Sequence, residues 1–522
     1  MARRPRPRPS AAPRHLPRLV LALVLACGAI ALAASAWLRP IDGDEGYYAA
    51  AAGLTAAGAR PYADYFYPQA PLLPWVYAPV VAAAGPSLRA LRWLSAALAL
   101  ATVLVWAWHL VRTRGAGSWL VPACLAVLVC SPGVVSWAVT VKTYALTNLL
   151  ASVALVALAR GLEPGAGRRW LAAAGLALGL AASTRLFYAP LGPVLAAGLV
   201  AWPGADGRRR AVRQAALLLG GFVLGCAPLV AAWAAAPDVF LFNNLGYHEL
   251  RYSELKDLHP EAGPPVRLAA ALTGTGRILA TNPYLLGTLL LAAWGIAGLG
   301  RLAGPARRFG TVAALAGAAY FLACMAPDPV HEQYFTAPLL PLLLPLVAVG
   351  LARLVRGGRG AAVAVVAAAT AGALVLGLLR PGMDPDPTWT FGSYDRVVAG
   401  IRRHSAPGDV VLSFWPGYVF GADRAHYPGL ENHFAVGVSE QLTPAEAVRY
   451  HIADRRRLQE AFAARRPHLV VLGTWMNEIN TALDNEQMRQ LLTVFQAEYE
   501  VVALHGQAKI CAPIPRRRGS AP

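Results

Sequence analysis

The sequence predicts a polytopic α-helical membrane protein of about 11 transmembrane helices with a small C-terminal α/β domain outside the cytoplasm. Of its 522 residues, 56% are hydrophobic and only 14% are charged. A soluble core of this size could not hide so much apolar surface, so most of it must face lipid. The apolar residues also gather in runs of roughly 16 to 24 residues, the length that crosses a hydrocarbon core of about 30 Å.

The first apolar run, 19–38, follows a basic and proline-rich segment, 1–18, which we expect in the cytoplasm. The small residues ALAASA near its end are also compatible with a cleaved signal peptide. We prefer an uncleaved span, because the run is long enough to cross the bilayer and others follow it. Further spans are expected at 88–111, 118–133, 144–160, 170–186, 187–202, 211–235, 283–300, 309–326, 336–352 and 361–380, so that the membrane domain covers 19–380.

The basic residues orient these spans. The net charge of +19 comes largely from arginines in every second short connection, for example Arg112 with Arg114 and Arg168 with Arg169, and the other short connections are nearly free of Lys and Arg. The positive-inside rule then places the N-terminus in the cytoplasm and the C-terminus outside. The clusters therefore indicate topology signals, and no nucleic-acid partner is expected. The bias toward Ala and Arg favours a bacterial source, hence the inner (plasma) membrane.

The connections on the outer face are the larger ones: 39–87, 236–282 and the tail, 381–522. The tail alternates strand-like runs such as DVVLSFW and HLVVLG with helical runs, which predicts a small α/β domain. Its loop segment WPGYVFGADRAHYPGLENHFAV either contacts an acceptor glycan or packs on the membrane part, and packing is the preferred interpretation. Six scattered cysteines give no disulfide or metal-type spacing.

The first outer connection holds an acidic cluster next to the membrane surface. Asp42, Asp44, Glu45 and Asp64 lie there among several tyrosines. Carboxylates near hydrocarbon lose hydration, so such a cluster needs a cation, a hydrogen-bonding shell or a catalytic use. The alternative is an interfacial loop with solvated acids and anchoring aromatic residues.

A short motif in this connection resembles a known group of enzymes. An Asp-Glu pair directly after the first span is followed by an aromatic and small-residue helix, then Pro-Tyr-x-Asp and Gln-x-Pro-Leu. This pattern resembles the GT-C superfamily of membrane glycosyltransferases, and most closely the protein O-mannosyltransferase and aminoarabinose transferase (family 39-like) group. The resemblance implies a polyprenyl-phosphate-linked sugar as donor, a lipid, glycan or protein as acceptor, and a segment 71–87 that lies along the outer interface.

The resemblance also implies roles for the acidic pair. Asp44 matches the acidic residue of the family and is the candidate general base for the acceptor hydroxyl. Glu45 is the second catalytic candidate, which either orients the acceptor or holds a metal. A lipid-phosphate sugar already carries a good leaving group, so the remaining need is for cations that stabilise the freed phosphate.

Lys142 and Arg185 are the main candidates for those cations, because they interrupt outer-face segments that are otherwise poor in positive charge. Side chains that snorkel at span ends are the alternative, and Arg251 and Lys256 are weaker candidates. The other expected substrate-binding residues are Tyr47 and Gln69 in the first connection and His331, Glu332, Gln333 and Tyr334 in PDPVHEQYF. The segment 242–261 is a candidate lid over a lipid groove.

No cofactor is assigned, although a divalent cation at the acidic pair stays open. Zinc at His331 and Glu332 is disfavoured, because adjacent side chains point in different directions and no helical i, i+4 partner is present. Two other functions remain as alternatives: a transporter or flippase, and a non-catalytic scaffold for the assembly of lipid-linked glycans. A transporter would require broken helices or a repeat between halves, which the sequence does not show.

Overall fold

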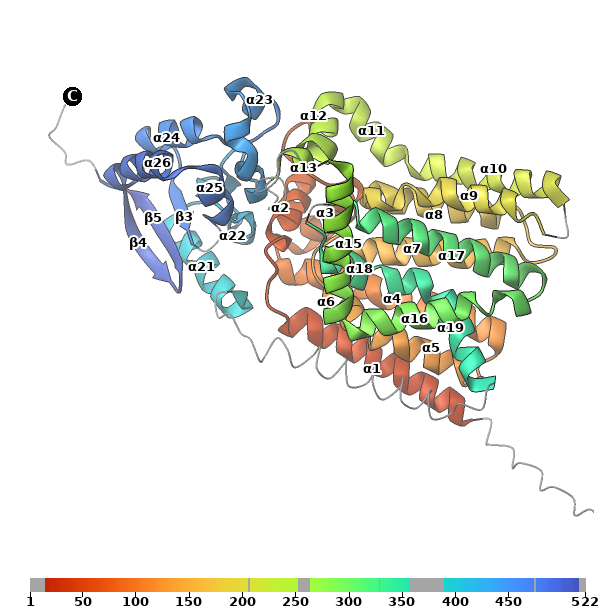
Figure 1. The fold of residues 1–522 in the computed structure, drawn as a ribbon. Helices are drawn as coiled ribbons and strands as arrows, with labels where there is room; N and C mark the ends of the chain where they lie inside the picture. The colour runs from red at the N-terminus through yellow and green to blue at the C-terminus, as the bar shows by residue number, and fades with distance from the viewer. Residues whose placement is uncertain are drawn as a thin grey trace, which may run out of the picture.

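The computed structural model describes residues 15–204, 207–251, 263–327, 329–356, 389–473 and 476–515. These residues form a bundle of apolar helices with an α/β domain packed on one end (Figure 1). Helix α1 (Leu16–Leu38) begins at the far end of the bundle and ends beside the α/β domain. The protein is therefore a multi-pass membrane protein in which the two parts of the expected architecture adjoin at one end of the helices.

The helices of the bundle run roughly side by side in Figure 1. Their bounds are Leu88–Arg114 (α4), Leu120–Val129 (α5), Pro132–Trp137 (α6), Tyr144–Gly161 (α7), Arg169–Thr184 (α8), Leu191–Ala201 (α9), Gly207–Gly225 (α10), Ala227–Ala235 (α11), Pro283–Ile296 (α16), Gly304–Cys324 (α17) and Leu339–Arg356 (α19). Close packing depends on small residues: an added Cβ at Gly175 of α8 would lie 1.9 Å from a carbonyl oxygen of α10. Glycine thus lets the two backbones touch.

Among the described residues, four segments are each long and apolar enough to cross a membrane: Leu16–Leu38, Leu88–Arg114, Tyr144–Gly161 and Pro283–Arg301. The pair α10 and α11, which bends by 41°, gives a fifth. The expected spans 118–133, 187–202 and 336–352 correspond to shorter apolar helices. The run 118–133 breaks at Ser131 and Pro132, because proline cannot continue a helix hydrogen-bond ladder. The run 361–380 lies outside the described residues, and the count of eleven spans stays a prediction.

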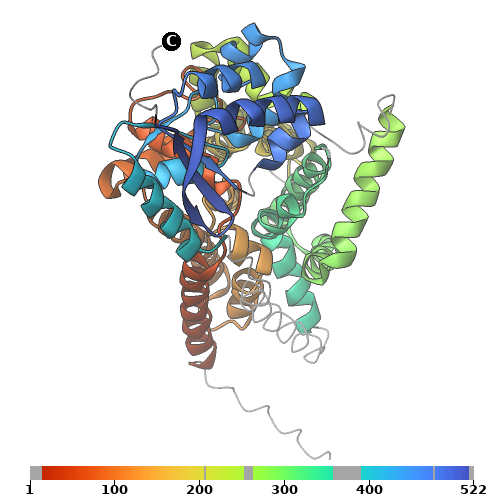
Figure 2. The same ribbon diagram turned by 90° about the vertical axis from the view of Figure 1, so that its left-hand side faces the viewer.

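Shorter elements cover the end of the bundle near the α/β domain. They are α2 (Glu45–Ala56), α3 (Leu72–Ala84), α12 (Pro237–Leu241), the π-helical turn η2 (Phe242–Gly246), α13 (Tyr247–Leu250) and α18 (Glu332–Thr336). Helix α15 (Pro264–Thr281) runs across the bundle helices instead of along them (Figure 1), and stands to one side of the molecule in Figure 2, where it is light green.

The C-terminal α/β domain contains a five-stranded sheet in the order β2-β1-β3-β5-β4. Its strands are β1 (Val410–Ser413), β2 (Ala425–His426), β3 (Leu469–Leu472), β4 (Tyr499–His505) and β5 (Ala508–Pro513). Strand β1 is parallel to β2 and β3, and β5 is antiparallel to β3 and β4. The apolar run of β1 is buried, as expected for a strand covered on both faces. The helices are α21 (Phe391–His404), α22 (Pro416–Ala422), the 3-10 helix η5 (His433–Gln441), α23 (Pro444–Arg449), α24 (Arg455–Ala463), α25 (Asn477–Ala482) and α26 (Asn485–Glu498).

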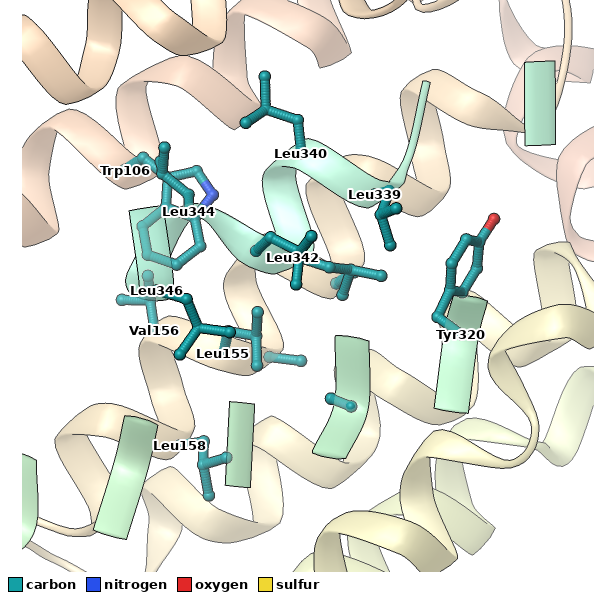
Figure 3. Packing of buried hydrophobic residues seen from close by; sticks show 14 of the residues in the cluster. Trp106, Leu155, Val156, Leu158, Tyr320, Leu339, Leu340, Leu342, Leu344 and Leu346 are labelled. Carbon is teal, nitrogen blue, oxygen red and sulfur yellow. The ribbon is translucent and has the colours of Figure 1, made fainter. Parts of the chain in front are cut away.

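Two hydrophobic cores organise the molecule. One fills the bundle, where Trp106, Leu155, Leu158 and Leu344 interdigitate (Figure 3). The other runs without interruption from α2, α3 and the start of α4 into the sheet domain. The first outer connection and the C-terminal domain therefore share one core. Residues 39–45, here called the acidic loop, lie where that core meets the bundle.

Candidate active site

The acidic loop connects the end of α1 to the start of α2 and is folded on itself. The backbone N–H of Asp42 donates to Glu45 Oε2 at 2.9 Å, and the backbone N–H of Asp44 donates to Asp42 Oδ1 at 3.0 Å. These two bonds satisfy amides that precede the helix and would otherwise lack partners. The second bond also fixes the carboxylate of Asp42.

Lys142, in the turn between α6 and α7, meets both of these carboxylates. Its Nζ lies 2.6 Å from Asp42 Oδ1 and 2.8 Å from Asp44 Oδ2, and it donates to Gln333 Oε1 at 2.9 Å. Burial acts to lower the pKa of Lys142, but the two carboxylates outweigh it and raise that pKa above its ordinary value. Three segments that are far apart in the sequence thus converge on one charged ammonium group.

The same ammonium group keeps Asp42 ionised. Burial alone would raise the pKa of the Asp42 carboxyl, but the charge and hydrogen bond of Lys142 lower it. Asp42 Oδ1 receives two donors, the Lys142 ammonium and the Asp44 amide. Among the contacts that the structure describes, the Asp44 carboxylate receives only the ammonium, and the Asp44 side chain is 28% exposed against 20% for that of Asp42. Asp44 is therefore the less anchored carboxylate.

Glu45 has a different environment from its neighbour Asp44. Its side chain is fully buried and forms an ion pair with Arg92 of α4, whose Nε donates to Glu45 Oε1 at 2.8 Å and whose Nη2 donates to Oε2. Glu45 Oε1 also accepts from the backbone N–H of Val141 at 2.9 Å. Arg92 in turn donates to the carbonyls of Arg39, at 2.7 Å, and Pro40, at 2.8 Å. Glu45 and Arg92 thus join the end of α1, the acidic loop and the turn that carries Lys142.

Arg185, directly after α8, is a buried cation among aromatic rings. Its guanidinium carbon lies 5.0 Å from the ring centre of Tyr144 and 4.6 Å from those of Phe187 and Tyr334. Nη1 donates to Thr143 Oγ1 at 3.0 Å, whereas Nε is buried with no hydrogen-bond partner in the described structure. A buried guanidinium that contacts rings and a hydroxyl, with a free N–H, is suited to an anion such as a phosphate.

The loop around α18 reaches this cluster from a third direction. Gln333 binds Lys142, the ring of Tyr334 faces Arg185, and the ring of His331 lies 5.1 Å from that of Tyr334. Burial and the charge of Arg251 lower the pKa of His331, so this ring is neutral at pH 7. Glu332, by contrast, is exposed at the start of α18.

The two remaining candidates lie in the first outer connection. Tyr47 is buried on α2, with its ring centre 4.1 Å from that of Tyr48 and 5.8 Å from that of Phe434 in the C-terminal domain. Gln69 is half-buried in the turn before α3. The candidate lid is described only as far as residue 251, and there Tyr247 donates to the carbonyl of Phe434 at 3.4 Å. Lys256 lies outside the described residues.

The C-terminal domain holds the acidic loop directly. The indole N–H of Trp415 donates to the carbonyl of Gly43 at 2.8 Å, and the backbone N–H of Ile41 donates to the carbonyl of Trp389 at 2.7 Å. At the rim of this contact, Arg89 makes a two-pronged bond to Asp395 at 3.1 and 2.9 Å.

Sequence reasoning missed Trp389, the pair of Arg89 and Asp395, and Arg92. A charge inside an apolar run was a usable signal for Arg92, because such residues need a buried partner. No local pattern pointed to Trp389, whereas Trp415 begins the loop segment that was expected to pack on the membrane part, and its contact with Gly43 agrees with that interpretation.

Comparisons with known proteins give structural matches only. No protein-family model and no curated protein matches the sequence. The structure of ArnT from Cupriavidus metallidurans bound to undecaprenyl phosphate is similar, with a TM-score of 0.66 and 16% identity over 95% of this chain and 98% of that one. Its apo state gives a TM-score of 0.65 at 16% identity over the same shares of the two chains.

A second enzyme shows the same fold more distantly. The oligosaccharyltransferase of Archaeoglobus fulgidus, in complex with Zn and sulfate, has a TM-score of 0.50 and 13% identity over 87% of this chain and 68% of that one. At such identities the likeness is one of fold. The chain therefore shares the fold of ArnT and of the oligosaccharyltransferase, which supports at the level of fold the resemblance that the acidic motif suggested.

Proposed function

We propose that this protein is a GT-C glycosyltransferase that moves a sugar from a polyprenyl phosphate to a lipid, glycan or protein acceptor. The observation that carries the proposal is one cluster in which the paired carboxylates Asp42 and Asp44 share Lys142 close to the buried, ring-bound Arg185. Both Lys142 and Arg185 contact residues of the α18 loop, through Gln333 and Tyr334. A base and phosphate-binding cations are the two requirements of the transfer reaction.

The location of this cluster, formed by Asp42, Asp44, Lys142 and Arg185, agrees with a sugar donor that is carried by a lipid. It lies at the end of the apolar bundle, where α1 finishes and the α/β domain begins (Figure 1). ArnT, which has this fold, was solved with undecaprenyl phosphate bound. With the arginine-rich connections in the cytoplasm, the cluster and the C-terminal domain face the outside of the bacterial inner membrane.

Asp44 acts as the base in this mechanism. Its carboxylate accepts the proton of the acceptor hydroxyl as the hydroxyl oxygen attacks the anomeric carbon. The bond between that carbon and the phosphate oxygen breaks, and its electron pair stays on the lipid phosphate. A single displacement of this kind inverts the anomeric centre. Asp44 is preferred over Asp42 because Asp42 Oδ1 already holds two donors.

The cations stabilise the charge that develops on the phosphate. Arg185 offers its unpaired Nε–H, and the rings of Tyr144, Phe187 and Tyr334 hold the guanidinium plane in place. Lys142 contacts the base, Asp44, and its ammonium group can also reach toward the lipid phosphate. Glu45 is a positioning residue in this scheme, because both of its oxygens are engaged by Arg92 and by backbone amides.

A divalent cation does not fit this arrangement well. The place between the carboxylates of Asp42 and Asp44 is taken by the Lys142 ammonium. Within the described ranges, no three His, Cys, Asp or Glu side chains are grouped as a metal site requires. The proposed mechanism therefore assigns the neutralising role to Lys142 and Arg185.

The direct test uses purified protein and a panel of polyprenyl-phosphate sugars, with release of the free lipid phosphate as the measurement. We expect release with at least one donor, and more of it when a membrane or glycan fraction supplies the acceptor. The same panel is run with EDTA, which should leave release unchanged. No release with any donor would contradict the proposal and favour a transporter or a scaffold.

A further inference from the structure

Two tryptophans of the C-terminal domain hold the backbone of the acidic loop. The carbonyl of Trp389 accepts from Ile41 N–H at 2.7 Å, and the indole N–H of Trp415 donates to the carbonyl of Gly43 at 2.8 Å. The two rings are perpendicular, with centres 5.8 Å apart. Gly43 lies between Asp42 and Asp44 in the sequence, so the Trp415 bond falls at the midpoint of the paired carboxylates.

The indole ring of Trp415 also packs against the first turn of α2. A Cβ atom added at Gly46 would lie 2.6 Å from the indole nitrogen and 2.9 Å from the backbone nitrogen of Gly417, closer than real Cβ contacts allow. The indole ring therefore touches the helix backbone itself. One side chain thus fixes both the carbonyl before Asp44 and the helix that follows it.

The orientation of Trp415 is set by its own domain. Its side chain is 1% exposed, and its ring packs against Tyr418 with centres 4.7 Å apart. The hydroxyl of Ser413 accepts from the backbone N–H of Trp415 at 3.2 Å and donates to its carbonyl at 2.8 Å. The indole is therefore a rigid donor that the sheet domain presents to the acidic loop.

We propose that Trp415 is a positioning residue for sugar transfer, through which the C-terminal domain sets the place of Asp44 relative to Lys142. The inference rests on the proposed function. A carboxylate 2.8 Å from its ammonium partner loses that contact after a small backbone shift, and misplacement of about 1 Å can lower a rate by about 100-fold. The contacts of Arg185 come from other elements, so donor binding does not depend on the indole.

The test compares three full-length proteins in the lipid-phosphate release assay. Trp415→Phe keeps an aromatic ring and removes the N–H donor. Replacement of Trp415 by benzothienylalanine keeps the bicyclic shape and removes only that donor. The matched control is Phe420→Leu, because Phe420 packs on the same helix at Gly53, 3.0 Å from an added Cβ, and makes no contact with Gly43.

The expected result is a fall in kcat of roughly 10- to 100-fold in both Trp415 variants, with the KM for the donor changed by less than about two-fold. Phe420→Leu should lower the thermal midpoint at least as much and keep the kcat of the native protein. The inference is overturned if the Trp415 variants keep native kcat, or if kcat falls in all three proteins in step with stability. An inactive native protein would instead overturn the proposed function, and this inference with it.

Discussion

Glu45 and Arg92 form an ion pair with neither side chain exposed to solvent, and Arg92 Nε lies 2.8 Å from Glu45 Oε1. Two adjacent acids therefore differ in solvent exposure: the Glu45 side chain is fully buried, and the Asp44 side chain is partly exposed. Charges removed from water are tolerated only with complete hydrogen bonding, which the Val141 amide and the Arg39 and Pro40 carbonyls supply here.

The first prediction concerns this pair. Glu45→Ala leaves the Arg92 guanidinium buried without its anion, and should lower the free energy of unfolding by about 3–5 kcal/mol. Asp395→Ala, which breaks the exposed pair with Arg89, should cost less than about 1 kcal/mol. Denaturant unfolding in detergent, followed by tryptophan fluorescence, measures both values. Equal losses would show that the Glu45 pair contributes no more than a surface contact.

Asp44→Asn should strongly lower the rate of sugar transfer and leave the amount of expressed protein unchanged. Loss of a general base typically lowers a rate by about 100- to 10,000-fold, and asparagine keeps the size of the side chain. Asp42→Asn is the comparison, and should act mainly by loosening Lys142, with a smaller decrease in kcat. Expression and thermal midpoint are measured alongside lipid-phosphate release. Full activity in Asp44→Asn would remove Asp44 from the mechanism.

Arg185→Lys tests the phosphate contact while keeping the charge. A lysine ammonium cannot present the planar guanidinium that packs against Tyr144, Phe187 and Tyr334; we expect the KM for the donor to rise by about 10-fold. Arg353→Lys is the control, since Arg353 also packs on a ring, 4.0 Å from the centre of Trp294, but on α19 away from the cluster. A similar change in both variants would point to a general effect on the bundle.

Gly46→Ala should weaken the docking of the C-terminal domain. The added methyl group would meet the Trp415 ring at 2.6 Å, and overpacking of this kind costs about 1–3 kcal/mol. Gly220→Ala gives the matched helical control, because nothing lies within 4 Å of its added Cβ and alanine favours the helix. Thermal midpoints should fall for the first variant and hold or rise for the second. The reverse order would mean that the close contact is not needed.

Glu431 predicts a pH dependence of stability. Burial raises the pKa of Glu431 to about 7, from 4.5 for a free side chain, against the lowering effect of backbone N–H groups and Arg457. The folded state then binds more protons than the unfolded state between pH 4.5 and 7, so stability should fall as the pH rises through that range. Glu431→Gln should reduce this slope in a series of thermal midpoints. An unchanged slope would show that other groups cause it.

Sequence patterns predicted the long apolar helices, which depend on composition, and the candidate cations, which stand out because few basic residues lie near them. Apolar runs gave the helices α1, α4 and α7, because length and hydropathy decide whether a helix can cross lipid. Lys142 and Arg185 could be selected because cations are scarce on that face. The structure brings both into the neighbourhood of Asp44 and the α18 loop.

Other features depend on contacts between distant segments and were out of reach. Trp415 and Gly43 are 372 positions apart, and no pattern in either segment indicates that the two residues meet. Asp44 and Glu45 are adjacent acids in the sequence, and the packing of Arg92 against Glu45 alone gives them different environments, which no local pattern indicated. The helix α15 was absent from the expected spans and elements, since the region 236–282 was read as a connection.

The single core that joins α2 and α3 to the sheet domain has a consequence for biogenesis. Residues near Tyr47 and Leu73 leave the ribosome hundreds of residues before Val411, Ile479 and Ile510, with which they share that core. The core around Tyr47 and Leu73 can therefore be completed only after the last part of the chain has been synthesised. A truncated or stalled chain would leave this apolar surface uncovered.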